Sequence, residues 1–282
     1  MENTAKSIVT ILGSGTSTGV PMVGCSCKVC TSLNTKDKRF RTSILIESAQ
    51  GNNILIDTTP DLRTQLLTHS VKKIDAAIIT HDHADHLHGI DDLRPYCFGP
   101  PIKKIPIVAE RNTAMTMTER FPYIFKADEI FSKERPIIGG GIPLLDLRPV
   151  IINDDDIVEI DIVGEKIKLF NLPHGHSKTT GIIHEKMAYI PDCHHISDQI
   201  VEKLSNISLD LLIIDCLQYD THETHLNIDA CFGFIRTMAP KRAILIHMNH
   251  EVLHNDLEKI AKQEFGTTVF PAYDGLKLTY LN

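Results

Sequence analysis

The fold of this chain is decided by the stretch Ile78-Ile79-Thr80-His81-Asp82-His83-Ala84-Asp85-His86. A β-branched apolar run predicts a buried strand, which ends in three histidines and two aspartates crowded between residues 81 and 86. Imidazole and carboxylate groups are ligands for Zn²⁺, Mn²⁺ and Fe²⁺. His81 and His83 can bind one metal, while Asp85 and His86, beyond the bend, can bind a second about 3.5–4 Å away. The alternative is a polar loop with chance histidines, which the rest of the chain disfavours.

Four other apolar runs end in the residue types that such a site needs. Asp57 ends the run 53–56, His174 follows an expected strand at 166–171, Asp192 follows the run 188–191, and His247 ends the run 243–246. Each of these residues therefore lies where a predicted strand ends.

This order of residues resembles the metallo-β-lactamase-fold hydrolases. The resemblance implies an α/β chain folded as a four-layer αββα sandwich, and it covers most of the sequence. It also implies a ligand set: His81, His83 and His174 for one metal; Asp85, His86 and His247 for the other; Asp192 as the bridge; and Asp57 as a supporting carboxylate. All seven ligand positions carry the required residue type.

Composition favours one globular domain. The chain has 282 residues, of which 42% are hydrophobic, and strand and helix patterns alternate along it, so we expect a single domain over residues 1–282. Net charge is −7, and no block of Lys and Arg resembles a nucleic-acid track, which disfavours nucleic acid as a partner. No apolar run has spanning length, and Met1–Lys6 is not followed by a secretory segment, so no membrane partner and a cytoplasmic location are expected.

Seven cysteines do not suggest a disulfide framework. Cys25, Cys27 and Cys30 are clustered on an expected loop, a spacing that suits thiolate coordination better than disulfides. The neighbouring sequence offers no obvious fourth ligand. Cys216 and Cys231, in apolar surroundings, are most simply small core residues.

The opening of the chain narrows the resemblance. Gly13-Ser14-Gly15 followed by Cys-x-Cys-x-x-Cys is similar to the phosphoribosyl cyclic phosphate phosphodiesterases of phosphonate breakdown, a PhnP-like group. The pyrroloquinoline quinone biosynthesis protein B family has a similar opening. In the phosphodiesterase group the three cysteines and a histidine hold a structural zinc, which implies His250 as the fourth ligand. Such a zinc would clamp the N-terminal loop against the loop that carries His247.

The same resemblance points to a histidine near the substrate phosphate. His225, before an expected helix at 227–238, aligns best, and an imidazole suits proton delivery to a leaving alkoxide. His222 competes for that role, or binds phosphate, or only solvates the loop. His176 lies close to His174 but fits the pattern less well. His194 and His195 more simply begin the next helix, and His69, His184 and His254 look like surface or boundary residues.

Two loops are harder to interpret. The segment at about 97–161, broken by prolines and by Gly139-Gly140-Gly141, predicts either a lid or insertion over the metals or a plain surface loop. A strand is expected at 163–169 and a helix at 196–204. The glycine-rich turn 13–19 resembles a phosphate cradle, but no Lys follows it, so a tight turn lining the site is the better interpretation.

The function that these residues predict is metal-dependent hydrolysis of a small phosphodiester, a cyclic phosphate being an apt substrate. A hydroxide between two metals (Zn²⁺ or Mn²⁺, with Fe²⁺ as a further candidate) would attack phosphorus, Asp85 and the other ligands would hold the metals, and His225 would protonate the leaving oxygen. The rivals are an RNA-processing nuclease resembling ribonuclease Z, thioester or lactam hydrolysis, and a non-catalytic zinc protein of a cofactor pathway. A homodimer is the default assembly.

Overall fold

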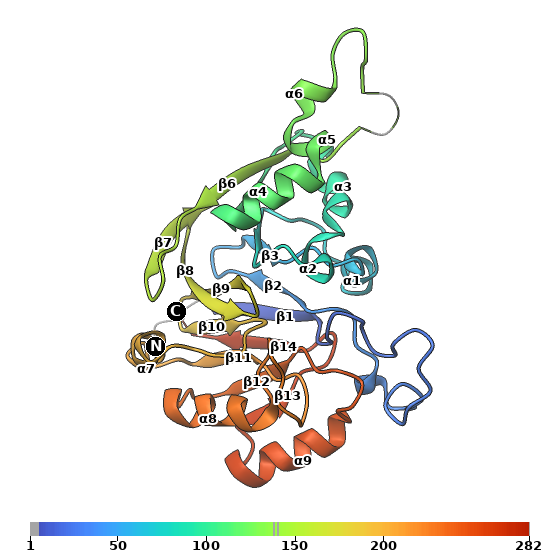
Figure 1. Cartoon of the computed structure of the whole chain (residues 1–282). Coiled ribbons are helices and arrows are strands. Elements are labelled where there is room, and N and C mark those ends of the chain that lie inside the picture. Colours follow the sequence, from blue (N-terminus) through green and yellow to red (C-terminus); the bar gives the residue numbers. More distant parts are fainter. Residues whose placement is uncertain (1–5, 138, 140, 282) are drawn as a thin grey trace.

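Two seven-stranded sheets lie face to face at the centre of the computed structural model, which describes residues 6–137, 139 and 141–281 (Figure 1). The first sheet has the order β14 (Lys277–Tyr280), β1 (Ser7–Gly13), β2 (Ser43–Glu47), β3 (Asn53–Ile56), β4 (Ala76–Ile79), β5 (Ile105–Glu110) and β6 (Leu145–Val150). The second has the order β13 (Val269–Pro271), β12 (Ala243–Ile246), β11 (Leu211–Asp215), β10 (Met187–Ile190), β9 (Ser177–His184), β8 (Glu165–His174) and β7 (Ile157–Ile162).

Helices cover the outer face of each sheet, which gives the expected four layers (Figure 1). On the first sheet lie α1 (Leu62–Thr68), α2 (Ala84–Leu87), α3 (Arg94–Cys97), α4 (Arg111–Arg120) and α5 (Pro122–Phe125), while α6 (Ala127–Ile130) packs next to α5 beyond the strands. On the second lie α7 (Asp198–Ser205), α8 (Ile228–Met238) and α9 (His254–Phe265). Two 3₁₀ helices complete the set, η1 (Thr35–Asp37) and η2 (Ile90–Leu93). The αββα fold predicted from the sequence is confirmed.

Each sheet changes from antiparallel to parallel pairing partway across. Strands β3 to β6 pair in parallel in the first sheet, and β10 to β13 do so in the second. Parallel strands point their carboxyl ends toward one edge, and loops after those ends are the usual place for a ligand site. The candidate ligands after β4, β10 and β12 follow these ends, whereas His174 ends β8, which pairs antiparallel with both its neighbours.

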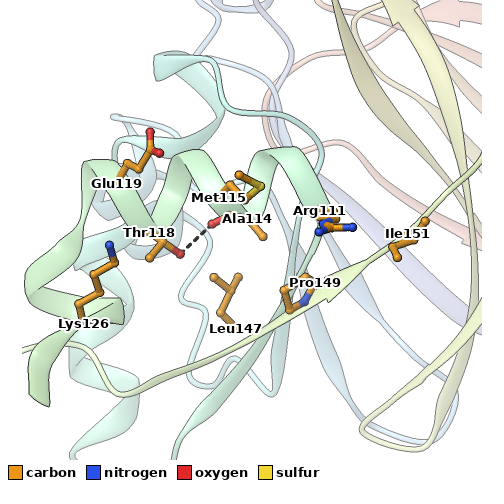
Figure 2. Close-up of a pocket in the computed structure, with 9 residues that line it drawn as sticks. All are labelled: Arg111, Ala114, Met115, Thr118, Glu119, Lys126, Leu147, Pro149 and Ile151. Carbon is orange, nitrogen blue, oxygen red and sulfur yellow. Dashed lines mark hydrogen bonds between the residues drawn. The ribbon is translucent and has the colours of Figure 1, made fainter. Parts of the chain in front are cut away.

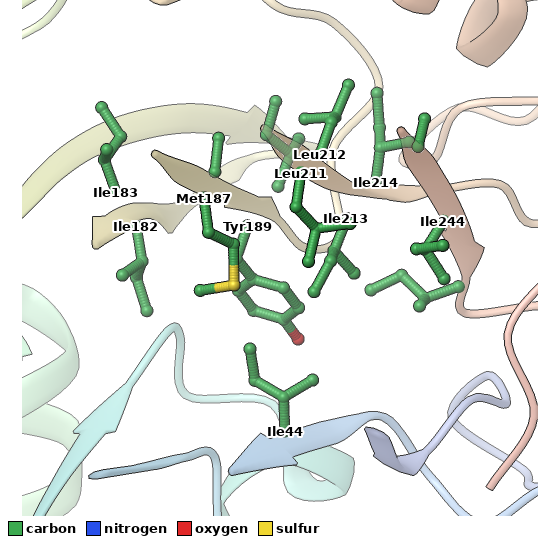
Figure 3. Close-up of a cluster of buried hydrophobic side chains, with 14 of the residues drawn as sticks. Ile44, Ile182, Ile183, Met187, Tyr189, Leu211, Leu212, Ile213, Ile214 and Ile244 are labelled. Atoms are coloured by element: carbon green, nitrogen blue, oxygen red, sulfur yellow. The ribbon is translucent and has the colours of Figure 1, made fainter. Parts of the chain in front are cut away.

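The core lies between the two sheets, where apolar side chains from both meet. Figure 3 shows Met187 and Tyr189 of β10 pointing toward Ile44 of β2. All three residues have no measurable exposure. Burying an aliphatic side chain fully stabilises the fold by about 1.5–3 kcal/mol relative to leaving it exposed. The strand ends that carry the site are therefore anchored in a dry, close-packed layer.

Two sequence predictions about local structure need correction. The strand expected at 163–169 is present but begins only at Glu165, because Val163 (φ 52°) and Gly164 (φ 82°) form the turn of a hairpin between β7 and β8. His194 and His195 do not begin a helix. The helix starts at Asp198, because the Ser197 side chain accepts a hydrogen bond from the backbone N–H of Ile200 and caps it.

The segment 97–161 contributes more to the sandwich than its broken sequence suggests. It supplies β5 and β6 to the first sheet and β7 to the second. Between α4 and β6 the chain projects beyond the sheets (Figure 1). A lid over the metals stays a prediction, and Gly140 of the glycine triplet lies outside the described residues.

Candidate metal centre

Three histidines converge at the end of β4 and the end of β8. The ligand atoms of His81, His83 and His174 lie within 4.8 Å of one another. His174 Nε2 and His83 Nδ1 are 3.2 Å apart. Two nitrogens bound to one Zn²⁺ at about 2.0–2.1 Å, at angles near the tetrahedral value, are separated by about that distance. The spacing therefore suits a metal held between them.

A second group adjoins the first, formed by Asp85, His86, Asp192 and His247. His86 Nε2 lies 3.2 Å from both Asp85 Oδ2 and Asp192 Oδ2. Asp192 Oδ2 also lies 3.8 Å from Nε2 of His81 in the first group. Asp192 thus lies between the two groups, where the sequence predicts the bridging ligand.

The buried nitrogens of these groups have the correct tautomer for binding cations. In His81, His86 and His174, Nδ1 lies within hydrogen-bond distance of a protein oxygen, which leaves Nε2 with its lone pair. The partners are Thr80 Oγ1 for His81 (3.0 Å), Asp57 Oδ2 for His86 (2.7 Å) and the Thr224 carbonyl for His174 (2.8 Å). In His247, Nδ1 lies 3.0 Å from Thr42 Oγ1 and 3.2 Å from Asp192 Oδ1. Nε2 of His81 and of His86, although buried, has no hydrogen-bond partner. A cation between these nitrogens and the neighbouring carboxylates would satisfy both, so these residues fit a metal.

Asp57 supports the second group as the sequence predicts. Its side chain is fully buried and accepts hydrogen bonds from His86 Nδ1, from Thr80 Oγ1 (2.9 Å) and from the Thr80 backbone N–H (2.8 Å). Thr80 in turn contacts His81, so one carboxylate orients a histidine of each group. Burial works to lower the pKa of His86, but Asp192, Asp85 and Asp57 outweigh it and raise that pKa. A bound cation would replace the proton that these carboxylates favour.

The glycine-rich turn after β1 lines the site, in agreement with the sequence interpretation. The Thr42 hydroxyl donates to the Gly15 carbonyl at 2.9 Å, and therefore accepts from His247. Thr16 Oγ1 lies 3.3 Å from His247 Nε2. Gly15 has no room for a side chain, since a Cβ atom would lie 2.7 Å from Arg39 Cβ. The turn closes tightly around the last predicted ligand.

His225 stands beside both groups on a loop after β11. Its ring centroid is 4.8 Å from that of His174 and 4.8 Å from that of His247. His225 Nδ1 donates to Asp215 Oδ2 at 3.0 Å. Burial works to lower the pKa of His225, but the fully buried Asp215 carboxylate raises it to about 9. The Asp215 carboxylate thus favours the protonated imidazole, against the opposing charge that a nearby cation would add.

His222 takes a different position on the same loop. It is exposed, and its ring centroid lies 5.3 Å from that of His225. Its Nδ1 accepts from the Thr224 backbone N–H at 3.3 Å. Local loop bonding thus occupies one nitrogen of His222, whereas His225 is oriented by a buried carboxylate. His176 is also exposed and joins none of the groups among the described residues.

The cysteine cluster meets His250 at the far side of the His247 loop. The ligand atoms of Cys25, Cys27, Cys30 and His250 lie within 4.8 Å of one another. His250 Nδ1 is 3.4 Å from Cys25 Sγ and 3.5 Å from Cys27 Sγ. A tetrahedral Zn²⁺ with Zn–S about 2.3 Å and Zn–N about 2.0–2.1 Å separates S and N by about 3.5 Å. The donor set fits the structural zinc that the resemblance implies.

Thiolate character supports that fit. Hydrogen bonds from the Cys30 backbone N–H and from His250 lower the pKa of Cys27 to about 6, while burial raises the pKa of Cys30 to about 11. A thiolate at Cys27 is a ready zinc ligand at neutral pH. The other four cysteines are buried and free, Cys216 and Cys231 in the core as predicted.

Sequence reasoning missed several residues around the site. Asp215 ends the buried strand β11 as Asp57 ends β3, so its position at a strand end was the available signal. The sequence contains no signal for the contacts made by Thr42, Thr80 and the Thr224 carbonyl, because hydroxyl and carbonyl groups occur throughout any chain. His184 and His254, expected to be surface or boundary residues, are buried; each is only 1% exposed. Their polar partners come from other strands and loops, which the local sequence does not show.

Comparison with known proteins agrees with this geometry. A model of the Beta-lactamase superfamily domain matches residues 52–248. The chain therefore belongs to the β-lactamase superfamily, and its fold and site define a metal-dependent hydrolase. Among the described residues, no helix combines the length and hydropathy needed to cross a bilayer.

Individual relatives confirm the predicted resemblance. A diphosphatase of the PhnP family has 32% sequence identity with the chain and a TM-score of 0.84, over 98% of both chains. Zn²⁺-bound PqqB of Methylobacterium extorquens shares the fold at 18% identity and a TM-score of 0.73, over 96% and 99% of the two chains. An octanoyltransferase of Porphyromonas gingivalis is 35% identical over 95% of this chain and 50% of its own length. The chain thus spans about half of that relative.

Proposed function

We propose that this chain is a dinuclear metal-dependent phosphodiesterase acting on a small substrate. The observation that carries the proposal is the position of His225: an imidazole oriented by buried Asp215 lies 4.8 Å, centroid to centroid, from His174 and from His247 of two adjoining groups of metal-ligating side chains. A site that only stored or structured a metal has no need of a proton donor beside it.

The ligand side chains form two groups, each of which could hold one cation. One would be held by His81, His83 and His174, the other by Asp85, His86 and His247, with Asp192 between them. A pair of divalent cations there would supply activated water at neutral pH and offset negative charge on phosphoryl oxygens. Asp57, Thr80 and Thr42 keep the ligand nitrogens in the correct tautomer and orientation.

His225 would act on the leaving group. Its Nδ1 proton is held by Asp215, so Nε2 is the atom that gives its proton to the departing oxygen of the ester. Asp215 also accepts hydrogen bonds from the backbone N–H groups of Cys193 and Leu226, both at 3.2 Å. These bonds keep the carboxylate in position to accept from His225 Nδ1. The same carboxylate stabilises the imidazolium until the proton is transferred.

A diphosphate ester is the second candidate substrate, favoured by the 32% identity to a PhnP-family diphosphatase. Both substrates present a bridging oxygen to His225 and a phosphorus to the cations. An RNA substrate is less well supported, because the net charge is −7 and no basic track is found in the sequence. Hydrolysis of an acyl thioester is the rival that the octanoyltransferase relative raises.

The decisive experiment uses the purified full chain loaded with Mn²⁺ or Zn²⁺. We expect hydrolysis of bis(p-nitrophenyl) phosphate, and also of a five-membered cyclic phosphate or a diphosphate ester. Asp85→Asn removes a ligand carboxylate and should reduce kcat/KM by at least about 10²-fold, because an interaction essential to the charged transition state is lost. Metal analysis should show reduced metal content in this variant.

Asp82→Asn is the matched control. Asp82 is close in sequence, but its carboxylate pairs with Arg120 at 3.4 Å and joins neither ligand group. Its turnover should be near that of the original chain. Turnover of an octanoyl thioester with none on any phosphoester, while both metals are bound, would contradict the proposal.

A further inference from the structure

We propose that the free edge of β6 is the interface for a second copy of this chain. Two β6 strands would pair antiparallel about a twofold axis that passes between the two Leu147 residues. The pairing would join the first sheets of both copies into one continuous sheet. The interface would not use the ligand-bearing strands themselves, because β5 separates β6 from β4, which leads into His81 to His86.

The outward side of β6 has backbone groups available for such pairing. β6 is the last strand of its sheet, with β5 on its inner side and no further strand in the described part of the chain. The Ile105 N–H donates to the Leu144 carbonyl at 2.9 Å, and Ile105 pairs in parallel with Leu145. The backbone N–H and C=O groups of successive residues in a strand point to opposite edges. Those of residues 144, 146, 148 and 150 therefore point toward β5, and those of residues 145, 147 and 149 point outward.

Pro149 agrees with this assignment. Proline has no N–H and is tolerated in a sheet only where that group would face away from a neighbouring strand. In the proposed pairing, the Leu147 residues would exchange both backbone hydrogen bonds, and each Leu145 N–H would donate to the partner's Pro149 carbonyl. Because Pro149 has no N–H, each Leu145 carbonyl would lack a partner in this pair, and the ladder would end there.

The charges on β6 are self-complementary. Asp146 and Arg148 flank Leu147, and an antiparallel pair centred there places each Asp146 opposite the partner's Arg148. Both side chains are about half exposed within one copy, at 46% and 49%, and contact each other at 2.8 Å. The other strand at this end of the molecule, β7, carries Glu159 and Asp161, which would meet as like charges in the same arrangement. The charges on these two edge strands therefore favour self-pairing of β6 over self-pairing of β7.

An apolar groove borders the same edge. Figure 2 shows α4 above the end of β6, with Leu147 and Pro149 pointing into the space between them. The groove has a volume of about 520 Å³, and Met115 and Ile151 on its rim are 56% and 62% exposed. Because Leu147 lies beside the proposed axis, the grooves of the two copies would face each other across that axis. Pairing would cover apolar surface that one copy leaves exposed.

The test is a charge swap on the metal-loaded full chain, followed by sedimentation velocity over a range of concentrations. We expect a dimer for the original chain. Asp146→Arg and Arg148→Asp each turn attractive cross-strand pairs into repulsive ones, and each should raise the dimer dissociation constant by about tenfold or more. The double variant Asp146→Arg/Arg148→Asp restores opposite charges across the axis and should restore the dimer.

A swap on β7 and β8, Glu159→Lys/Lys166→Glu, is the matched control, because that exposed pair lies at 3.6 Å on strands outside the proposed interface. It should leave the dimer unchanged. A chain that remains monomeric at all concentrations would overturn the proposal, as would a dimer insensitive to both single swaps. Failure of the double variant to recover, with unchanged thermal unfolding, would exclude this register.

Discussion

At the scale of single residues, the site depends on which nitrogen of each histidine carries the proton. Thr80, Asp57, Thr42 and the Thr224 carbonyl each take the Nδ1 side of one ring. A histidine with Nδ1 so occupied presents Nε2 in one direction only. The arrangement therefore removes both tautomer and rotamer freedom before a cation arrives, which favours its binding.

His225 gives the sharpest prediction at this scale. His225→Gln keeps a polar group beside Asp215 but removes the transferable proton. For an ester with a poor alkoxide leaving group we expect kcat to fall by about 10²–10⁴-fold, the usual contribution of a general acid. For a p-nitrophenyl ester, whose leaving group needs no proton, the loss should be much smaller.

The comparison of the two substrates is the measurement. The original chain should also lose activity on the alkoxide ester as the pH rises above the pKa of His225, because only the protonated imidazole can donate. His222→Gln is the control and should change both substrates equally or not at all. Equal large losses for both substrates in His225→Gln would assign His225 a structural role.

At the scale of elements, the segment of residues 15–39 is tied to the segment after β12. Gly15 pairs with Met248, and the buried guanidinium of Arg39 donates to the carbonyls of Asn249 (3.0 Å) and Val252 (2.8 Å). The Cys25, Cys27, Cys30 and His250 group closes the same connection three residues beyond His247. A zinc held there would fix the direction in which the chain leaves the site.

Removing one thiolate tests this connection. Cys27→Ser should reduce the metal content from about three to about two ions per chain, because a serine hydroxyl is a poor zinc ligand. The variant should unfold at a lower temperature, since binding energy at a structural zinc contributes to folding. Metal analysis and thermal unfolding measure the two effects.

Ser26→Ala is the control within the same loop, because Ser26 is exposed and belongs to no ligand group among the described residues. It should keep its metal and its unfolding temperature. Unchanged metal content in Cys27→Ser would show that the cysteine cluster is not a zinc site.

At the scale of the whole molecule, a buried polar cluster joins the two sheets at the end opposite the metal centre. Glu165, at the start of β8, accepts from Asn52 (2.8 Å) and from Ser48, which belong to the first sheet and its turn. His184, at the end of β9, shares a 2.7 Å hydrogen bond with the Tyr280 hydroxyl of β14. Each contact crosses from one sheet to the other.

Tyr280→Phe should therefore destabilise the sandwich without affecting the chemistry. The variant leaves buried His184 without its hydroxyl partner, which costs about 1–3 kcal/mol. Urea unfolding measures the loss, and kcat on the phosphodiester should stay within about twofold, since the cluster lies at the far end of β8 and β9. A large loss of activity with unchanged stability would contradict this separation. Tyr219→Phe, at an exposed position, is the control.

The sequence by itself determined the class of fold and most of the candidate site. Apolar runs ending at Asp57, His81, Asp192 and His247 predict buried strands, and the residue at a strand end is a local property of the chain. The structure brings those ends together. Turn positions were less certain, as at Val163–Gly164, because a hairpin between two amphipathic strands can shift by a few residues.

Only the tertiary structure decided which groups orient the metal-ligating side chains and which strand has an edge available for pairing with another strand. Thr42 and His247 are 205 positions apart, and Asp215 meets His225 only because the loop after β11 folds back on its own strand. The buried state of His184 and the free edge of β6 depend on which strands become neighbours. Such contacts join segments whose packing is set by the whole core, so no local pattern contains them.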